Sequence, residues 1–324
     1  MKILVVGLGS IGCRHVRNLK AMDPAVEIAV LRQHHRSRDL GEMAALVKEV
    51  FFDQAAAEAW QPQVVVVSNP APMHIETAMR FAHIGAHLFI EKPLSVSLEG
   101  IGRLQDICLE KKLTAMVGYV LRFLPPLVLM KTILDQGRIG RLRSVQAHVG
   151  KHLSSWREGD YRAQVSARRD LGGGVVLELS HELDYVRWLA GEVAEIQALT
   201  GTLGGFDIDV EDTAEIQARH EGGVLSHIHL DMLDHAPNRG CRLIGTTGTL
   251  VWESVSAQHA VRLWTGQGPW QTVYEENDLD PNAIHAAQWR HFFDCVHTGC
   301  PPLVNLSEAK RVLELSLAVL GRQG

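Results

Sequence analysis

Residues 2–12 read Lys2-Ile3-Leu4-Val5-Val6-Gly7-Leu8-Gly9-Ser10-Ile11-Gly12. The first five residues are mostly apolar and β-branched, which predicts a buried strand. The following six have the spacing Gly-x-Gly-x-x-Gly, and residues 13–22 then carry apolar side chains at helical spacing. This order of strand, glycines and helix is the context that a dinucleotide-binding fingerprint requires. We therefore predict that residues 7–12 bind a dinucleotide cofactor.

Each glycine of this fingerprint has a separate expected role. Gly7 makes the tight turn, Gly9 lets the backbone approach a pyrophosphate, and Gly12 lets the helix pack close to the strand. The start of the helix offers unbonded N–H groups and a partial positive charge to the phosphates. The alternative interpretation is a glycine turn with no ligand.

The bulk composition limits the classes of protein that this chain can belong to. With 324 residues it is too long for one ordinary core, so we expect two domains. A net charge of −5 does not favour nucleic acid or a membrane surface. The start shows no signal-peptide pattern, and no apolar run approaches the ~20 residues of a membrane span.

Five cysteines are scattered without a C-x-x-C motif. An odd, dispersed set favours reduced thiols in a cytoplasmic protein over a disulfide framework.

Short apolar runs alternate with helical patterns through the first 120 residues. After residues 2–6, strands are predicted at 26–31, 49–52, 64–67, 88–90 and 114–119. This alternation predicts a parallel, doubly wound sheet of the Rossmann type. Ligands bind such sheets at the carboxyl ends of the strands. The polar or glycine residues expected at those ends are Gly7, Arg32, Ser68, Glu91 and Lys92.

Arg32 ends the second predicted strand, twenty positions after Gly12. An acidic residue near this position selects the ribose hydroxyl of NAD, whereas an arginine suits the 2′-phosphate of NADP. The loop beyond it is basic, with His34, His35, Arg36 and Arg38. We predict NADP, with NAD possible; the alternative for this loop is a solvated polar segment.

Lys92 follows the strand at 88–90 directly after Glu91. A lysine at a strand end is a surface charge by default. At this strand end, however, it would lie over the nicotinamide of a bound cofactor. Low dielectric and a neighbouring cation lower the pKa of a lysine toward neutrality, which suits proton transfer.

Four motifs together resemble the Gfo/Idh/MocA family, the glucose–fructose oxidoreductase and inositol dehydrogenase type of NAD(P)-dependent oxidoreductase. They are Gly7-x-Gly9-x-x-Gly12, the loop Asn69-Pro70…His74, Glu91-Lys92-Pro93 and Gly118-Tyr119…Arg122-Phe123. The resemblance implies that Ser68, Asn69, Pro70, His74, Glu91 and Lys92 contact the cofactor. It also implies that Arg122 contacts the substrate.

A domain boundary is expected near residue 122, giving a cofactor domain at 1–122 and a substrate-binding and oligomerisation domain at 123–324. Beyond it, a helix is predicted at 125–136 and a strand at 142–149. The polar stretch that follows is rich in arginine and aromatic residues, which makes it a candidate substrate rim or an ordinary surface loop. Its candidate substrate residues are Trp156, Arg157, Tyr161 and Arg168.

Residues 175–189 have the spacing of one helix after Gly172-Gly173-Gly174. Glu178, His181 and Asp184 step by three and would share one side of that helix. From the residues alone they are a solvated ion pair, a metal pair or an acid/base pair. Because no Cys or His set with ligand spacing accompanies them, we predict no metal.

The resemblance assigns these residues a role. It implies that His181 and Glu178 act with Lys92 as the catalytic group and that Asp184 is part of the substrate site. The chain departs from the family pattern because Glu178 replaces an aspartate and lies three residues before His181, where many members have four.

Several strands follow, at 196–200, 213–220, 224–231, 241–245 and 249–252, with Gly222-Gly223 in a hairpin turn. They predict a large, mostly antiparallel open sheet, so the fold class is α/β with a Rossmann domain and a second α/β domain. In relatives the outer face of this sheet forms a dimer interface, which implies a homodimer or homotetramer. Helices are predicted at 282–297 and 307–320, the last packing back across the domains.

These observations predict an NAD(P)-dependent oxidoreductase that acts on a hydroxyl or keto carbon of a sugar, cyclitol or sugar-nucleotide. The cofactor supplies the hydride chemistry, and the protein supplies position and a path for the proton. Two alternatives remain. One is a non-catalytic dinucleotide-binding sensor or regulatory protein, and the other is a dehydrogenase of a non-sugar diol or ketone.

Overall fold

The structure, a computed structural model, describes residues 1–32, 40–156, 159–255 and 257–322. The chain forms two compact units. Unit 1 comprises residues 1–119 and 285–313, and unit 2 comprises residues 120–284 and the chain from 314 onward. The sequence predicted a single division after residue 122, whereas residues 285–313 lie in the same unit as the N-terminal segment.

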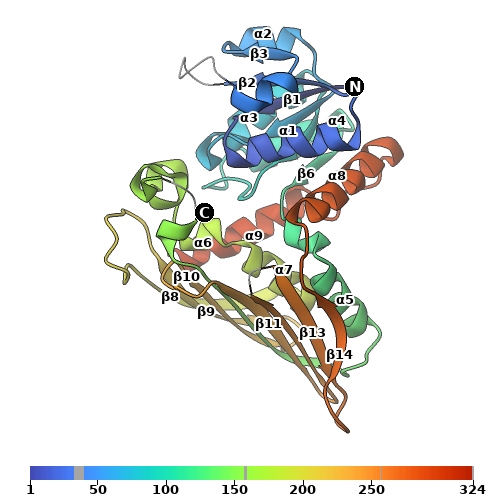
Figure 1. The fold of residues 1–324 in the computed structure, drawn as a ribbon, viewed down its shortest axis with the longest axis vertical. Helices are drawn as coiled ribbons and strands as arrows, with labels where there is room; N and C mark the ends of the chain where they lie inside the picture. The colour runs from blue at the N-terminus through green and yellow to red at the C-terminus, as the bar shows by residue number, and fades with distance from the viewer. Residues whose placement is uncertain (33–39, 157–158, 256, 323–324) are drawn as a thin grey trace. The chain divides into compact units, whose positions relative to one another are not determined.

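Unit 1 contains a six-stranded sheet in the order β3-β2-β1-β4-β5-β6 (Figure 1). All of its strand pairs are parallel. The predicted doubly wound parallel sheet is therefore confirmed. Its strands are β1 Lys2–Val6, β2 Glu27–Leu31, β3 Glu49–Phe51, β4 Val64–Val67, β5 His87–Ile90 and β6 Ala115–Val117.

The central strands of this sheet are covered on both faces. The four valines of β4 are all buried, which explains why that strand reads as a continuous apolar run. Trp289 stacks on Phe89 with ring centroids 4.3 Å apart. The helices of unit 1 are α1 Ser10–Met22, α2 Gln54–Ala59, α3 His74–His83, α4 Ile101–Glu110 and most of α8 Pro281–Thr298.

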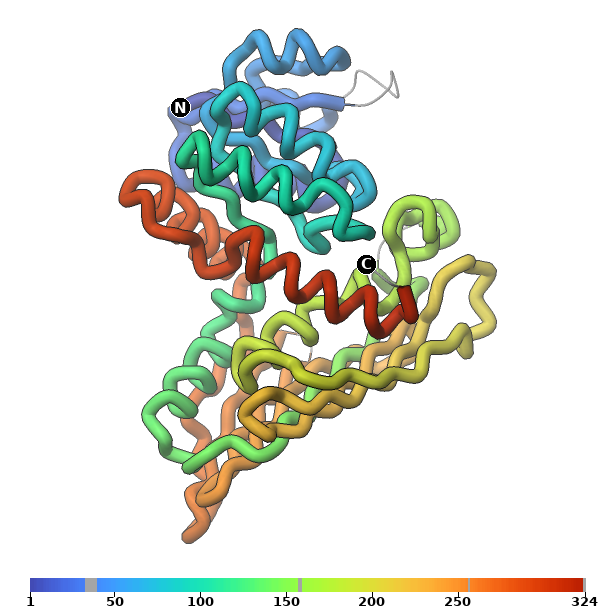
Figure 2. Tube along the Cα trace, turned by 180° about the vertical axis from the view of Figure 1, so that it is seen from behind, coloured from blue at the N-terminus to red at the C-terminus, as the bar shows by residue number. Residues whose placement is uncertain are grey.

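Unit 2 contains an eight-stranded sheet in the order β14-β13-β12-β11-β7-β10-β9-β8. The yellow to orange part of the trace in Figure 2 includes the later strands of this sheet, which run side by side. Its pairs are antiparallel except β7 with β10, which confirms the predicted mostly antiparallel sheet. Its strands are β7 Leu142–Gly150, β8 Val193–Gly201, β9 Thr213–His220, β10 Leu225–Asp231, β11 Asn238–Gly245, β12 Thr249–Val255, β13 Gln258–Trp264 and β14 Gln271–Glu276.

One face of the eight-stranded sheet carries the helices of unit 2. Helix α5 (Pro125–Asp135) contacts β12 and β13, whereas α6 (Val175–Glu178) and α7 (His181–Ala190) contact β7, β9 and β10. The predicted single helix over 175–189 is wrong, because the chain leaves helical conformation between α6 and α7. Helix α9 (Leu306–Val319) belongs to both units, with its residues up to 313 in unit 1.

Helices that could cross a membrane are absent from the part of the chain that the structure describes.

Candidate functional site

The glycine fingerprint has the geometry that its spacing predicts. Gly7 has φ +91°, and a Cβ there would lie 2.7 Å from the Ser68 carbonyl oxygen. At Gly12 a Cβ would lie 2.3 Å from the Gly7 carbonyl oxygen, so only glycine lets α1 approach the turn this closely. At Gly9, in contrast, a Cβ would meet nothing within 4 Å. The middle glycine therefore faces open space, where a ligand can reach the backbone.

Helix α1 begins in that open space. Gly9 is its N-cap, and no side chain of the described residues caps its first turn. Leu8 and Ile11 are half-buried, while Gly9 and Ser10 are exposed. The first-turn N–H groups therefore lack a side-chain acceptor, which makes this terminus suited to a phosphate anion.

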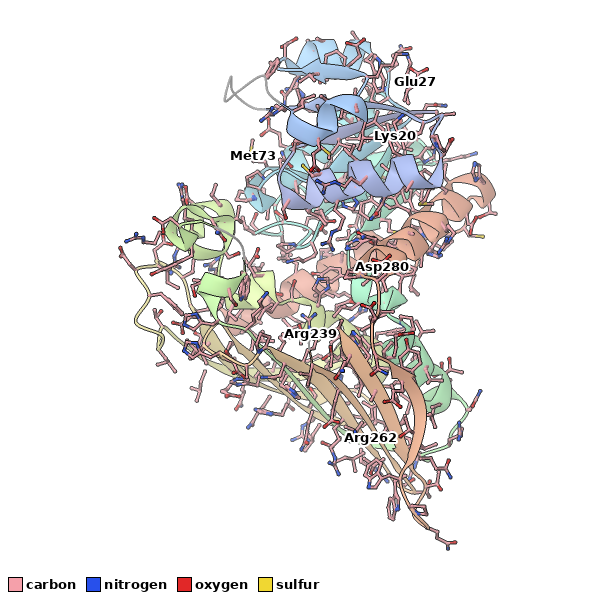
Figure 3. All side chains as sticks on the ribbon, viewed as in Figure 1. Lys20, Glu27, Met73, Arg239, Arg262 and Asp280 are labelled. Carbon is pink, nitrogen blue, oxygen red and sulfur yellow. The ribbon has the colours of Figure 1, made fainter. Side chains whose placement is uncertain are left out.

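The loop after β4 is tied to the fingerprint by hydrogen bonds. The Ser68 hydroxyl lies 2.9 Å from the Gly7 carbonyl oxygen and 3.1 Å from that of Val6. The Asn69 amide donates to the Thr77 hydroxyl at 2.9 Å. Pro70 is half-buried and directly precedes the short helix Ala71–Met73. The label on Met73 in Figure 3 marks the end of this helix. The structure thus brings the predicted residues Ser68 and Asn69 beside Gly7, at the ends of neighbouring strands.

His74 is in the interior, with 1% of its surface exposed. Its Nε2 lies 2.8 Å from the Asn69 carbonyl oxygen, and its Nδ1 lies 2.9 Å from that of Pro93. Burial lowers the pKa of His74 and outweighs these two backbone bonds, which raise it. The prediction made His74 a cofactor contact, but its ring nitrogens instead join the loop after β4 to the segment after β5.

Arg32 directly follows β2 and is half-buried. Its backbone N–H donates to the Phe51 carbonyl oxygen at 2.9 Å, which continues the pairing with β3. Its position at the end of β2 is the one predicted. The basic residues of the loop that follows, His34, His35, Arg36 and Arg38, lie outside the described residues.

Glu91 and Lys92 follow β5 but differ in their surroundings. Glu91 is 8% exposed, and its carboxylate accepts hydrogen bonds from the His15 ring at 2.7 Å and the Lys92 backbone N–H at 3.2 Å. Burial raises the pKa of Glu91, but the His15 bond and nearby positive groups outweigh it, so the net pKa is lowered. The structure therefore directs the Glu91 carboxylate to protein donors, whereas the prediction directed it to the cofactor. Lys92 is half-buried.

In unit 2, Glu178 and His181 flank the break between α6 and α7. Both are half-buried, and the Ser166 hydroxyl donates to Glu178 Oε2 at 2.9 Å. The Ser180 hydroxyl donates to the Leu177 carbonyl oxygen at 2.9 Å within the break. The two candidate catalytic residues therefore belong to different helices, and the expected three-residue step along one helix does not apply.

Arg122 and Asp184 form a buried ion pair. Their side chains are 1% and 0% exposed, and two hydrogen bonds of 2.8 Å join the guanidinium to the carboxylate. The guanidinium also lies over the Trp188 ring, 4.9 Å from its centroid. We predicted both residues to contact substrate, but the structure binds them to each other beneath the surface.

A hollow of about 460 Å³ lies at one end of the eight-stranded sheet. Trp156, one of the predicted substrate residues, lines it, and its indole donates to the Lys151 carbonyl oxygen at 2.7 Å. Leu179, which separates Glu178 from Ser180, also lines it. The hollow therefore adjoins the break that carries the two candidate catalytic residues of unit 2.

Two cationic residues of this hollow were not predicted from the sequence, Lys151 and Arg239. Arg239, labelled in Figure 3, lies near the start of β11 and forms an ion pair of 2.8 Å with the fully buried Glu182. No aspartate or glutamate is among the described residues that line the hollow. Nothing in the sequence marks these two residues, because strand pairing alone brings the ends of β7, β11 and β12 together.

The other predicted rim residues are not among those that line this hollow. Tyr161 packs edge-on against Phe206 with centroids 5.6 Å apart. Arg168 is exposed and pairs with Asp170 at 2.5 Å. Arg157 lies outside the described residues. A group of three or more His, Cys, Asp or Glu residues that could hold a metal ion is not found within residues 1–32, 40–156, 159–255 and 257–322.

Comparison with known proteins matches both parts of the chain to one family. Residues 1–119 match the model described as "Oxidoreductase family, NAD-binding Rossmann fold", and residues 127–251 match the "GFO/IDH/MocA C-terminal domain".

Relatives with similar sequences extend over nearly the whole chain. The chain is 26% identical to myo-inositol 2-dehydrogenase of Thermotoga maritima, covering 98% of this chain and 95% of that protein. It is 23% identical to scyllo-inositol 2-dehydrogenase (NAD(+)) of Bacillus subtilis, covering 98% and 92%. Levoglucosan dehydrogenase in complex with NADH has a similar fold, with a TM-score of 0.88 at 18% identity over 99% of this chain and 96% of that one.

The two family models together span most of the chain and agree with the sheet of each unit. The order of the motifs, the conformation of the glycine fingerprint and the eight-stranded sheet all fit that assignment. The chain belongs to the Gfo/Idh/MocA family of oxidoreductases, with an NAD-binding Rossmann domain at its N-terminus.

Proposed function

We propose that this protein is a nicotinamide-dependent dehydrogenase that transfers hydride between the cofactor and a hydroxyl-bearing or keto carbon of a cyclitol or sugar. The observation that carries the proposal is the open position at Gly9, which lies before the uncapped start of α1. Full-length similarity to two inositol dehydrogenases supports the substrate class.

Residues 7–12 would hold the pyrophosphate, and Ser68 to Pro70 would border it. A bound nicotinamide supplies the hydride chemistry, so the protein must bind and orient the substrate and move its hydroxyl proton. We propose NADP as the preferred cofactor, because Arg32 stands where an acid would select NAD. His74 and Glu91 would shape this site from inside without touching the cofactor.

Lys92 and His181 would exchange the hydroxyl proton with the substrate, and Glu178 would orient His181 or bind a neighbouring hydroxyl. A group that exchanges a proton must reach the substrate, and both candidates are half-buried, so part of each remains accessible. Arg122 and Asp184 would not touch substrate. Their buried pair would instead hold α7 in place beneath His181.

The substrate would occupy the hollow lined by Trp156 and Lys151. An aromatic ring offers an apolar face for the C–H side of a polyol, and the cations offer donors to its hydroxyl oxygens. The Trp156 ring is held by its indole hydrogen bond, so this surface is ordered before binding. The free state of all five cysteines supports the expectation that the protein works in the cytoplasm.

The experiment is a panel of inositols, sugars and simple diols, each incubated with NAD⁺ or NADP⁺ while the reduced nicotinamide is followed by absorbance. We expect turnover with at least one cyclitol or sugar and a faster rate with NADP⁺. Binding of cofactor without turnover of any compound would favour the alternative of a non-catalytic dinucleotide-binding sensor or regulatory protein. Turnover of simple diols alone would favour the non-sugar dehydrogenase.

A further inference from the structure

Three buried groups of unit 1 come from distant parts of the sequence and meet beside Lys92. His15 lies on α1, Trp289 lies on α8, and Glu91 follows β5. His15 and Trp289 are fully buried. A buried histidine in a cofactor-binding helix needs polar neighbours, because an unpaired ring nitrogen in the interior is costly.

The hydrogen bonds of His15 define its tautomer. The Trp289 indole Nε1 lies 3.1 Å from His15 Nδ1. An indole nitrogen can only donate, so Nδ1 must accept and therefore carries no proton. The remaining proton is on Nε2, which lies 2.7 Å from Glu91 Oε1 and donates to it.

Aromatic packing holds the two rings in this orientation. The planes of His15 and Trp289 are 88° apart with centroids separated by 5.5 Å. Phe89 stacks on Trp289 and meets the edge of His15 at 5.1 Å. Rotation of either ring would therefore disturb a close-packed cluster, which keeps the indole N–H directed at Nδ1.

The Glu91 carboxylate connects the His15 ring to the backbone of Lys92 by hydrogen bonds. Oε1 accepts from His15, while Oε2 accepts from the Lys92 N–H at 3.2 Å. A Cβ at Gly118 would lie 3.0 Å from Oε1, so glycine leaves the space that the carboxylate fills. Both oxygens thus have a donor, and the carboxylate is held from two sides.

The neighbouring ring of His285 also lacks a positive charge. His285 lies 6.1 Å from His15 between ring centroids, and its Nε2 is 3.3 Å from Arg14 Nη1. Because a guanidinium can only donate, this nitrogen of His285 accepts. Burial lowers the pKa of His285 to about 4, so the ring is neutral at physiological pH.

We propose that His15, held as its Nε2–H tautomer by Trp289, is a positioning residue that sets the Glu91 carboxylate and through it the main chain of Lys92. It links the cofactor-binding helix to the segment that carries the proposed proton-transfer group. The inference rests on the proposed function, because Lys92 is the group that it positions. Its loss should reduce turnover while the fingerprint backbone still binds cofactor.

The direct test is the protonation state of His15 in protein labelled with ¹⁵N-histidine. The chain has 17 histidines, so the His15 signal is assigned by its loss in His15→Gln. We expect a proton on Nε2 and none on Nδ1 in the wild type. Substitution Trp289→Phe keeps an aromatic ring but removes the N–H donor to Nδ1, so the Nε2–H tautomer should no longer be fixed by this bond. A wild-type His15 with its proton on Nδ1, or on both nitrogens, would overturn the proposal.

The kinetic test compares variants of the same cluster. His15→Leu removes the donor to Glu91 and should lower kcat about 10-fold or more, since a hydrogen bond to a charged group is lost. His15→Gln retains an N–H donor and should therefore keep most of the wild-type kcat. In both, the Kd for cofactor should stay within about 3-fold of wild type, because the main-chain phosphate site is intact.

If His15→Leu does not fold, Trp289→Phe replaces it in the kinetic test. This variant should also lower kcat. Its matched control is Trp264→Phe, which removes the indole bond to the Gly268 carbonyl oxygen in unit 2 and should leave kcat unchanged. Equal kcat in Trp289→Phe and wild type, or equal losses in His15→Leu and His15→Gln, would contradict the positioning role. If the wild type turns over no compound, the proposed function fails, while the His15 tautomer still decides this inference.

Discussion

Lys92, His181 and Glu178 are the residues to which we assign the proton chemistry. Proton transfer by a positioned group contributes about 10²–10⁴ to a rate. Lys92→Met and His181→Ala should each lower kcat by about that factor, while the Kd for cofactor, measured by fluorescence titration, stays nearly unchanged. Glu178→Gln should lower kcat by a smaller factor, because Glu178 supports Lys92 and His181 without touching the reacting atoms.

The order of these three effects tests the assignment more sharply than their sizes. Wild-type turnover in Lys92→Met together with an inactive Glu178→Gln would reverse the roles. Full activity in all three variants would place the site elsewhere.

Arg32 decides the choice between cofactors in our account. Arg32→Asp should weaken NADP(H) binding about ten- to hundredfold, since a charged hydrogen bond contributes roughly 1.5–3 kcal/mol. The variant should bind NAD(H) as well as the wild type or better. Parallel titrations with both cofactors measure this preference, and equal wild-type affinities that do not change in the variant would refute it.

The sequence predicted the type and position of individual site residues but not the orientation of their side chains. The ends of β1, β4 and β5 carry the predicted Gly7, Ser68 and Lys92. His74 and Glu91 were predicted at the same edge, yet their side chains are bonded inside the protein. Sequence spacing places a residue at a strand end but does not say whether its side chain faces the ligand or the core.

The Arg122–Asp184 pair joins the short helix Val120–Phe123 to α7, so its removal should loosen the element that carries His181. Asp184→Ala leaves a buried guanidinium without its carboxylate and should lower the free energy of unfolding by about 3–5 kcal/mol. Urea denaturation followed by tryptophan fluorescence measures the change.

The matched control is Asp170→Ala, which removes the carboxylate of the exposed pair with Arg168. Exposed pairs contribute about 0–1 kcal/mol, so this variant should unfold nearly as the wild type does. Similar losses in the two variants would show that the buried pair has no special role in stability.

Most helices and strands follow the hydrophobic period of the sequence, but the helix predicted over 175–189 and the end of the eight-stranded sheet do not. Residues 175–189 contain no proline or glycine, so their period predicted one helix. The break arises where the Ser180 hydroxyl bonds to the backbone of α6, an interaction that competes with helical pairing. Strands β13 and β14 extend the sheet beyond the predicted end at Trp252, although Val261 and Leu263 show the alternation of a half-buried strand.

The eight-stranded sheet presents one face whose side chains remain exposed at alternate positions of β7 and β9. That face is mainly polar: His227 and His229 both bond to Glu215 across the β9–β10 pair. A shallow hollow of about 380 Å³ lies on it, lined by residues that include Gln146, Gln217 and His227. We propose that a second copy of the chain covers this face, as the family resemblance implies.

Self-association through this face is open to a direct test. Light scattering at micromolar concentration should show a dimer or tetramer, and a monomer would contradict the proposal. Leu199, 79% exposed, pairs with Glu215 on β9, so Leu199→Glu should weaken the assembly by placing a charge in a desolvated interface. Leu109, 81% exposed on α4, offers the matched control Leu109→Glu, which should leave the oligomer intact.

Hydride transfer itself is the claim on which the whole account depends, and isotope transfer measures it directly. The substrate identified in the panel is prepared with deuterium on its carbinol carbon and incubated with the enzyme and oxidised cofactor. Mass spectrometry of the recovered cofactor should show one deuterium per turnover on the nicotinamide ring, with the keto product formed in equal amount. Product formed without deuterium in the nicotinamide, or no product from any cyclitol or sugar, would contradict the account.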